Sequence, residues 1–137
     1  MADELILSSK LIQKMTEHAT NCLPEEACGL LAGAGTRVYE VIPVENIEHS
    51  PVRYRMKPQD QLSALLYIDE NSWDLLGIYH SHPGGPETPS ETDIEEAFYP
   101  ESIYVIISKS NDKWTIRGFT IQERKPIEIT IHSDQTE

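Results

Sequence analysis

Three potential metal ligands, His80, His82 and Asp93, lie close together in the stretch GIYHSHPGGPETPSETD, residues 77–93. The apolar run before the histidines, residues 73–79, is typical of a buried strand. Side chains two apart on a strand point the same way, so the two histidines share a face. Two imidazoles and one carboxylate are three ligands of a tetrahedral zinc site whose fourth position is left for water.

A strand, a loop and a helix start must position these ligands. The segment PGGPETP, residues 83–89, breaks regular structure, and Ser90 then starts a helix that places Asp93 in its first turn. Ser-x-x-Asp is also a helix-capping pattern, and H-x-H occurs by chance in many proteins. The breaker-rich loop, the acid in the first turn and a glutamate-bearing segment upstream together favour the metal site.

That upstream segment, PEEACG, supplies two candidate bases, Glu25 and Glu26. A hydrolytic zinc needs a carboxylate that is not a ligand, to take a proton from water and return it to the leaving amine. Adjacent residues of a strand face opposite ways, so only one of the two can face the metal. The residues alone leave this choice open, and also leave open that both are solvated acids at a strand entrance.

Hydrophobic periodicity predicts a mixed order of elements and therefore an α+β fold, with a central, mostly antiparallel sheet covered by helices on both faces. The expected strands are residues 4–7, 24–33, 36–44, 53–56, 73–79, 102–108, 113–121 and 125–131. The expected helices run from Ser8 or Ser9 to about Cys22, from Pro58 to about Asn71 and from Ser90 to about Phe98. With 137 residues we expect one domain, residues 1–132, followed by a frayed tail, residues 133–137.

The net charge of −12 argues against nucleic acid as a partner. The densest basic cluster consists of Arg53, Arg55 and Lys57, which alternate along one face of a predicted strand. This face is either simply solvated or a binding site for a partner's acidic surface or terminal carboxylate. No apolar run approaches the ~20 residues that span a bilayer, and the acidic start lacks the features of a signal peptide, so we expect a cytoplasmic protein that does not enter a membrane. The two cysteines form no C-x-x-C pair, and Cys28 is expected to be a small buried hydrophobe.

The whole set of motifs resembles the JAMM (MPN+) family of zinc peptidases. The matching residues are Glu26 in EACG, the HSHP segment 80–83, and Ser90 and Asp93 in SETD. The resemblance implies a JAMM/MPN fold, similar to that of cytidine deaminases, and one Zn²⁺ per chain held by His80, His82 and Asp93. It also implies that Glu26 is the general base and then the acid, and that Ser90 donates to the oxyanion.

The resemblance is strongest to small bacterial members and implies a peptidase or isopeptidase that uses a metal-activated water. Its expected substrate is a ubiquitin-like, β-grasp sulfur carrier of the ThiS/MoaD type or its conjugate, cut after a C-terminal Gly-Gly. The alternatives are a non-catalytic scaffold and a JAMM peptidase of another substrate class. A zinc deaminase is rejected because H-x-E and P-C-x-x-C are absent. The other histidines, His18, His49 and His132, are expected to be dispensable for metal binding, while the carrier and the oligomeric state stay open.

Overall fold

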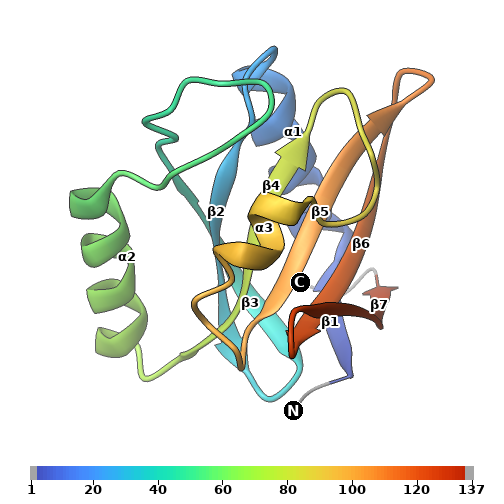
Figure 1. Cartoon of the computed structure of the whole chain (residues 1–137). Helices are drawn as coiled ribbons and strands as arrows, with labels where there is room; N and C mark the ends of the chain where they lie inside the picture. The colour runs from blue at the N-terminus through green and yellow to red at the C-terminus, as the bar shows by residue number, and fades with distance from the viewer. Residues whose placement is uncertain (1–2, 135–137) are drawn as a thin grey trace.

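The computed structural model describes residues 3–134, which form seven strands and three helices (Figure 1). In chain order these are β1 Glu4–Ser8, α1 Ser9–Cys22, β2 Cys28–Ala34, β3 Arg37–Val44, α2 Pro58–Glu70, β4 Asp74–His82, α3 Glu91–Glu95, β5 Ile103–Ser110, β6 Lys113–Gln122 and β7 Lys125–Asp134. All three expected helices are present, although α3 ends earlier and β2 begins later than expected. No helix within the described range is long and apolar enough to cross a membrane.

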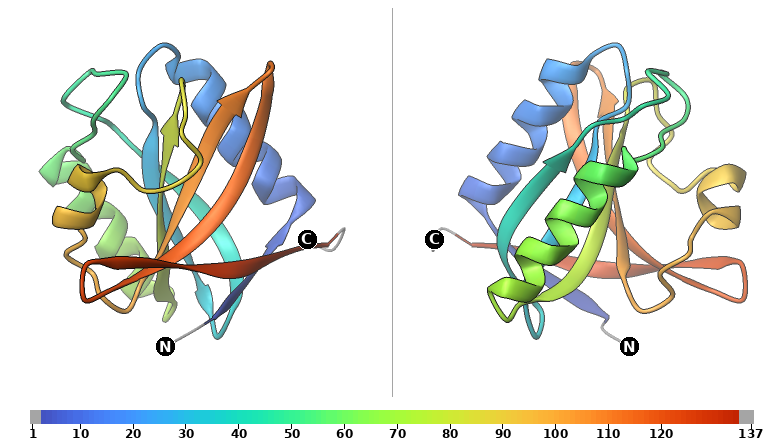
Figure 2. Two further views of the ribbon diagram at one scale, coloured as in Figure 1. Left: turned by 45° about the vertical axis from the view of Figure 1, so that its right-hand side comes forward. Right: turned by 90° about the vertical axis from the view of Figure 1, so that its left-hand side faces the viewer.

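The strands close into a barrel in the order β1-β3-β2-β4-β5-β6-β7, with β7 paired back to β1. The expected central sheet is therefore corrected in one respect, because it closes on itself and has no free edges. It is mostly antiparallel, as expected: four of its seven pairs are antiparallel, and the parallel ones are β4–β5, β1–β7 and β1–β3. The cause is the length of β7, whose 10 residues cross the molecule to reach β1 (Figure 2, left). The antiparallel hairpin of β2 and β3 is confirmed.

The expected frayed tail is wrong for its first two residues. Ser133 and Asp134 belong to β7 and pair with β1, and the Asp134 carboxylate accepts a hydrogen bond from Arg37 at 3.0 Å. The parallel pairing with β1 supplies main-chain partners that a tail would lack. Residues 135–137 lie outside the described part of the chain.

The expected short strand at residues 53–56 is also wrong, because this segment makes only an isolated bridge between Met56 and Asn46. The Asn46 side chain bonds the main chain of Arg53 and Arg55 here. These main-chain groups are therefore satisfied by a side chain instead of by a neighbouring strand.

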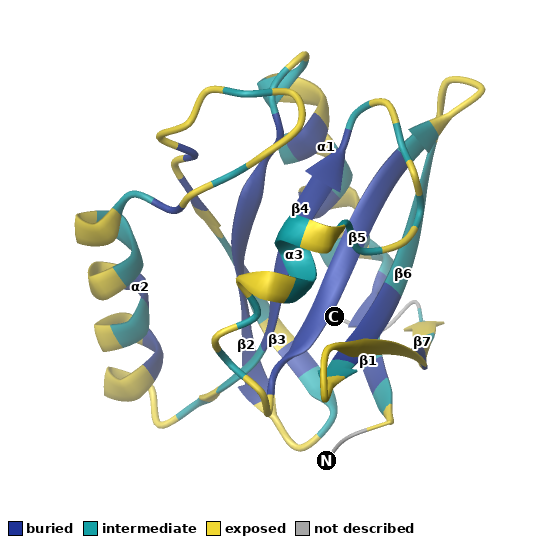
Figure 3. Cartoon of the chain, in the orientation of Figure 1, coloured by how far each residue is buried: buried dark blue, intermediate teal, exposed yellow. Residues whose placement is uncertain are grey.

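Helices cover both faces of the central strands, as expected. Helix α1 packs into one buried cluster, and α2 packs into the other (Figures 1 and 3). Consecutive residues of β4 alternate between them: Ile78 lies in the α2 cluster and Tyr79 in the α1 cluster. This alternation assigns His80 and His82, at the end of β4, to the α2 side of the sheet.

Candidate active site

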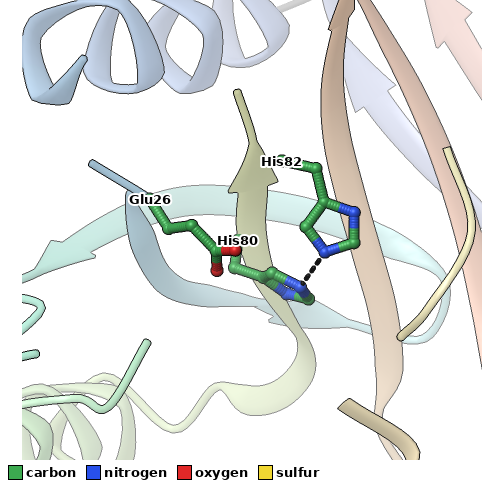
Figure 4. A group of neighbouring side chains, drawn as sticks. All are labelled: Glu26, His80 and His82. Atoms are coloured by element: carbon green, nitrogen blue, oxygen red, sulfur yellow. Dashed lines mark hydrogen bonds between the residues drawn. The ribbon is translucent and has the colours of Figure 1, made fainter. Parts of the chain in front are cut away.

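The two motif histidines are buried side by side at the end of β4 (Figure 4). His80 is 1% exposed and His82 is 5% exposed, and their Nε2 atoms lie 2.9 Å apart. Ser81, between them, turns the other way, and its hydroxyl accepts a 2.7 Å hydrogen bond from the main-chain N–H of Ala27. The alternation that gathers the imidazoles thus also ties β4 to the segment that carries Glu26.

Asp93 lies with the two histidines in a cluster of three potential ligand atoms. Its Oδ2 lies 3.1 Å from the Nε2 atoms of both His80 and His82. The carboxylate is held by a capping box: Ser90 N–H donates to Asp93 Oδ2 at 2.9 Å, and Asp93 N–H donates to Ser90 Oγ at 3.0 Å. Burial opposes ionisation, but the hydrogen bonds with the two histidines outweigh it and hold the pKa of Asp93 well below its usual range.

The protonation pattern of the histidines suits a cation. The carbonyl of Pro86, in the breaker-rich loop, lies 2.7 Å from His82 Nδ1, and a carbonyl can only accept, so Nδ1 carries the hydrogen. Burial lowers the pKa of His82, but the hydrogen bonds with Asp93 and the Pro86 carbonyl outweigh it and raise the pKa above its ordinary value. When the ring gives up its second proton, as metal binding requires, the lone pair of Nε2 points into the cluster. Burial lowers the pKa of His80, which favours its neutral, ligating form. Two imidazole nitrogens and a carboxylate oxygen that converge in this way fit a zinc ion.

The structure distinguishes the two adjacent glutamates. Glu26 is 3% exposed, and one of its carboxylate oxygens lies with ligand atoms of His80 and His82 in a group whose members are all within 4.8 Å of one another (Figure 4). Glu25 instead contacts His49, with its Oε1 3.1 Å from Nδ1. Burial raises the pKa of Glu26 to about 8, with His82 opposing and Asp93 adding to the rise. A carboxyl group in this setting can hold and release a proton near neutral pH.

The Glu26 Oε1 and His80 Nδ1 atoms are buried and have no hydrogen-bond partner among the described residues. Unpartnered buried polar atoms are costly and tend to mark functional sites. The Glu26 carboxylate belongs to the group around the proposed metal position, whereas His80 turns Nε2 toward that position and Nδ1 away from it. The lack of a protein partner for Glu26 Oε1 therefore supports a site that is completed by a ligand or solvent.

The three basic residues do not form one patch at the cluster. Arg55 lines a cavity of about 230 Å³ beside Tyr54, whereas Arg53 is exposed and is not among the residues that line it. The Lys57 ammonium lies 3.8 Å from Glu45. Of the three basic residues, Arg55 is the one that lines this cavity, together with Pro58 and Gln61 of α2.

Sequence reasoning missed Tyr54, whose ring stacks on His80 with centroids 4.5 Å apart and planes at 23°. The alternation of arginines on either side of it was a usable signal, because if they face solvent the tyrosine must face inward. It also missed Asn46, for which no motif gave a signal.

The three remaining histidines lie away from the cluster. His18 Nδ1 contacts the Tyr79 hydroxyl at 2.8 Å on the α1 side, and His49 contacts Glu25. His132 Nε2 lies 3.1 Å from Glu4 at the β1–β7 pairing.

A sequence model of the family described as prokaryotic homologs of the JAB domain matches residues 8–120. The chain is 36% identical to the CysO-cysteine peptidase of Mycobacterium tuberculosis over 106 residues, covering 76% of this chain and 73% of that protein. It is 32% identical to the desampylase of Haloferax volcanii over 124 residues, covering 88% of each.

Solved structures agree with this match. The solution structure of a Desulfitobacterium hafniense protein is 36% identical, with a TM-score of 0.87, covering 96% of this chain and 94% of that one. The fold is also that of a JAB1/MPN domain protein from Archaeoglobus fulgidus, with a TM-score of 0.63 at 21% identity, covering 95% of this chain and 98% of that one.

Proposed function

The chain belongs to the prokaryotic family of JAB domains, and on that premise we propose that it is a zinc-dependent peptidase or isopeptidase acting on ubiquitin-like sulfur carriers. The observation that carries the proposal is the convergence of His80, His82 and Asp93 within 3.1 Å beside the buried Glu26. Three ligands with a non-ligand carboxylate nearby are what metal-assisted hydrolysis requires.

His80, His82 and Asp93 would hold one Zn²⁺ per chain. When bound, the ion supplies Lewis acidity for a carbonyl and makes water a better nucleophile at neutral pH. Two neutral ligands and one anion leave the site net positive, which favours both effects. Polar contacts orient two of the ligands before the ion arrives, from the Pro86 carbonyl to His82 and from Ser90 N–H to Asp93. The third ligand, His80, is oriented by the stacked ring of Tyr54.

Glu26 is the residue we assign to proton transfer. Its carboxylate is buried beside the ligand group and has one unpartnered oxygen, so it can take a proton from the attacking water and deliver it to the leaving amine. The raised pKa of Glu26 favours the protonated form that the second of these steps needs.

Ser90 is assigned to the oxyanion of the substrate. Its oxygen already accepts from Asp93 N–H, and a hydroxyl can accept and donate at once. The hydroxyl hydrogen is therefore free to stabilise negative charge that develops on the scissile carbonyl. The capping and oxyanion roles are compatible.

The substrate class is supported by the relatives, one a CysO-cysteine peptidase and one a desampylase, and by the chain's match to most of their length. We propose cleavage after the C-terminal Gly-Gly of a ThiS/MoaD-type carrier, from which an amino acid, a short extension or a conjugated protein is released. Glycines suit a narrow cleft because they carry no side chain. Arg53, Arg55 and Lys57 remain proposed contacts of the carrier, and a cytoplasmic location remains a prediction.

The test is cleavage of a carrier that bears a short extension after Gly-Gly, followed by mass spectrometry. The zinc-loaded protein should cut after the second glycine, and a carrier with two bulky residues there should be cut poorly. Removal of zinc with a chelator should stop cleavage, and added zinc should restore it. A fully zinc-loaded protein that cleaves no carrier would favour the alternatives, a binding scaffold or a peptidase of another substrate class.

A further inference from the structure

Asn46 is a buried amide just after β3 that uses its whole hydrogen-bonding capacity on main chain. It is 7% exposed. Its Nδ2 donates to the carbonyls of Glu26 at 3.0 Å and Arg53 at 3.2 Å. Its Oδ1 accepts from the N–H groups of Glu48 and Arg55, each at 3.0 Å. Two donors and two acceptors are all that an asparagine side chain has, so each position is occupied.

These bonds join two segments that are far apart in sequence and that both contact the proposed metal site. One end is the main chain of Glu26, the proposed base. The other end brackets Tyr54, whose ring stacks on the ligand His80 at 4.5 Å. The same loop is held to Glu26 by a second bond, from Glu26 N–H to the carbonyl of Ser50 at 2.8 Å.

No ordinary replacement preserves this pattern. The amide orientation is determined by its partners, because two of them are carbonyls and two are N–H groups. An aspartate keeps both acceptors but faces the two carbonyls with a negative oxygen, and an alanine loses all four bonds. Position 46 therefore requires a side-chain amide, whereas most loop positions accept any polar residue.

We propose that Asn46 is a positioning residue of the reaction, which sets the separation between the Glu26 carboxylate and the Tyr54–His80 pair. The proposal rests on the proposed function for its catalytic meaning. The metal ligands lie on β4 and α3, which Asn46 does not contact through these bonds. Loss of its donors should therefore disturb proton transfer while metal binding is retained.

Asn46→Asp is the test variant, and Asn71→Asp is its matched control. Asn71 is exposed at the end of α2, and its Nδ2 donates to the carbonyl of Tyr67 at 2.9 Å, so the control loses the same kind of bond. We expect Asn46→Asp to keep full zinc content, with kcat lowered ~10–100-fold and KM changed little, because small displacements of a catalytic group cost rate. Asn71→Asp should match the wild type in all three quantities.

A second control separates positioning from loss of stability. Val38→Ala removes two methyl groups from the α1 core cluster, and Val38 is not a member of the metal group. This variant should have a lower melting temperature. At assay temperatures where it is still folded, its kcat should equal that of the wild type. The inference is overturned if Asn46→Asp cleaves at the wild-type rate, or if its zinc content falls in proportion to its activity. It is also overturned if Asn46→Asp and Val38→Ala lower the melting temperature equally and lower kcat equally.

Hydrogen exchange provides a readout that does not depend on activity. In Asn46→Asp, amides of residues 26–28 and 48–57 should exchange faster, while those of β4 and β5 keep their protection. Should the wild type cleave no carrier, the proposed function fails on that result alone. The linkage by Asn46 is then supported if exchange becomes faster in both segments of Asn46→Asp, and it is contradicted if exchange becomes faster in only one of them or in neither.

Discussion

Glu25 and Glu26 are neighbours in the chain, but they have opposite surroundings. Glu25 is partly exposed and contacts His49, and Glu26 is buried beside the potential metal ligands. Their chemistry is the same, so any difference between their variants reports position alone. This makes the pair an internal control for the proposed base.

Glu26→Gln should keep zinc and the fold but lose ~10²–10⁴ in kcat, because an amide cannot take or deliver the proton. Glu25→Gln should cleave at close to the wild-type rate. Both variants are measured for cleavage rate against zinc content. An active Glu26→Gln, or one that is inactive only through loss of metal, contradicts the assigned role.

His80→Ala and Asp93→Ala should each lose most of the zinc, because two remaining ligands bind the ion weakly and hydrolysis needs a fixed site. His132→Ala, at an exposed position on β7, should retain one zinc per chain. Elemental analysis after extensive dialysis measures this. Full zinc in both ligand variants would show that the ion binds elsewhere.

Ser90→Ala should lower kcat by ~10²–10³, the usual cost of one oxyanion donor. It should also cost about 1 kcal/mol of stability, because Ser90 caps α3. Ser8→Ala is the matched control, since Ser8 caps α1 and accepts from Leu11 N–H at 3.2 Å. It should lose similar stability and no activity, and equal loss of activity in the two variants would remove the oxyanion role.

At the scale of elements, α1 contacts the face of β4 opposite the proposed metal site through His18, whose Nδ1 lies 2.8 Å from the hydroxyl of Tyr79. Burial, and after it the charge of Lys14, lowers the pKa of His18 below its ordinary value of 6.5. The unfolded chain therefore binds a proton more readily than the folded chain does. The contribution of His18 to the free energy of unfolding is therefore full above pH 6.5. It is lost progressively as the pH falls from 6.5 to the pKa of His18 in the folded state.

His18→Gln should reduce this loss of stability, because glutamine can still bond the tyrosine and does not titrate. The measurement is the melting temperature of zinc-loaded wild type and variant between pH 5.5 and 8, a window set by the ordinary pKa of 6.5. The two curves should run parallel at the alkaline end and diverge on the acid side. Parallel curves throughout would mean that His18 does not contribute.

Most elements could be predicted from the sequence, because periodicity and breakers are local signals. The helix start at Ser90 was predicted correctly for this reason, and so was the shared face of His80 and His82. The segment 53–56 was not, because its alternation resembles a strand while the Arg53 carbonyl and the Arg55 N–H are bonded by the side chain of Asn46. No local pattern reports which distant side chain satisfies a loop.

At the scale of the whole molecule, closure of the barrel depends on β7 and could not be predicted, since a strand's sequence does not specify which edge it meets. Two isoleucines of this strand test what closure contributes. Ile129 is 7% exposed and packs over Gly118, where an added Cβ would lie 2.9 Å from its Cδ1. Ile127, two residues earlier, is 46% exposed.

Ile129→Ala should lower the free energy of unfolding by ~2–4 kcal/mol, through lost burial and the cavity left behind. Ile127→Ala should change it by less than ~0.5 kcal/mol, as is usual for exposed positions. Urea unfolding of zinc-loaded protein measures both. Equal values for the two variants would mean that β7 adds little to the core.

The capping box gives Asp93 a second property. Its carboxylate is held by Ser90 N–H, so its rotamer freedom is lost when the chain folds. An arriving ion then bears none of that entropic cost, and a departing ion does not release the helix start. At the proposed zinc site the loss and return of the ion would therefore not require the start of α3 to unfold and refold.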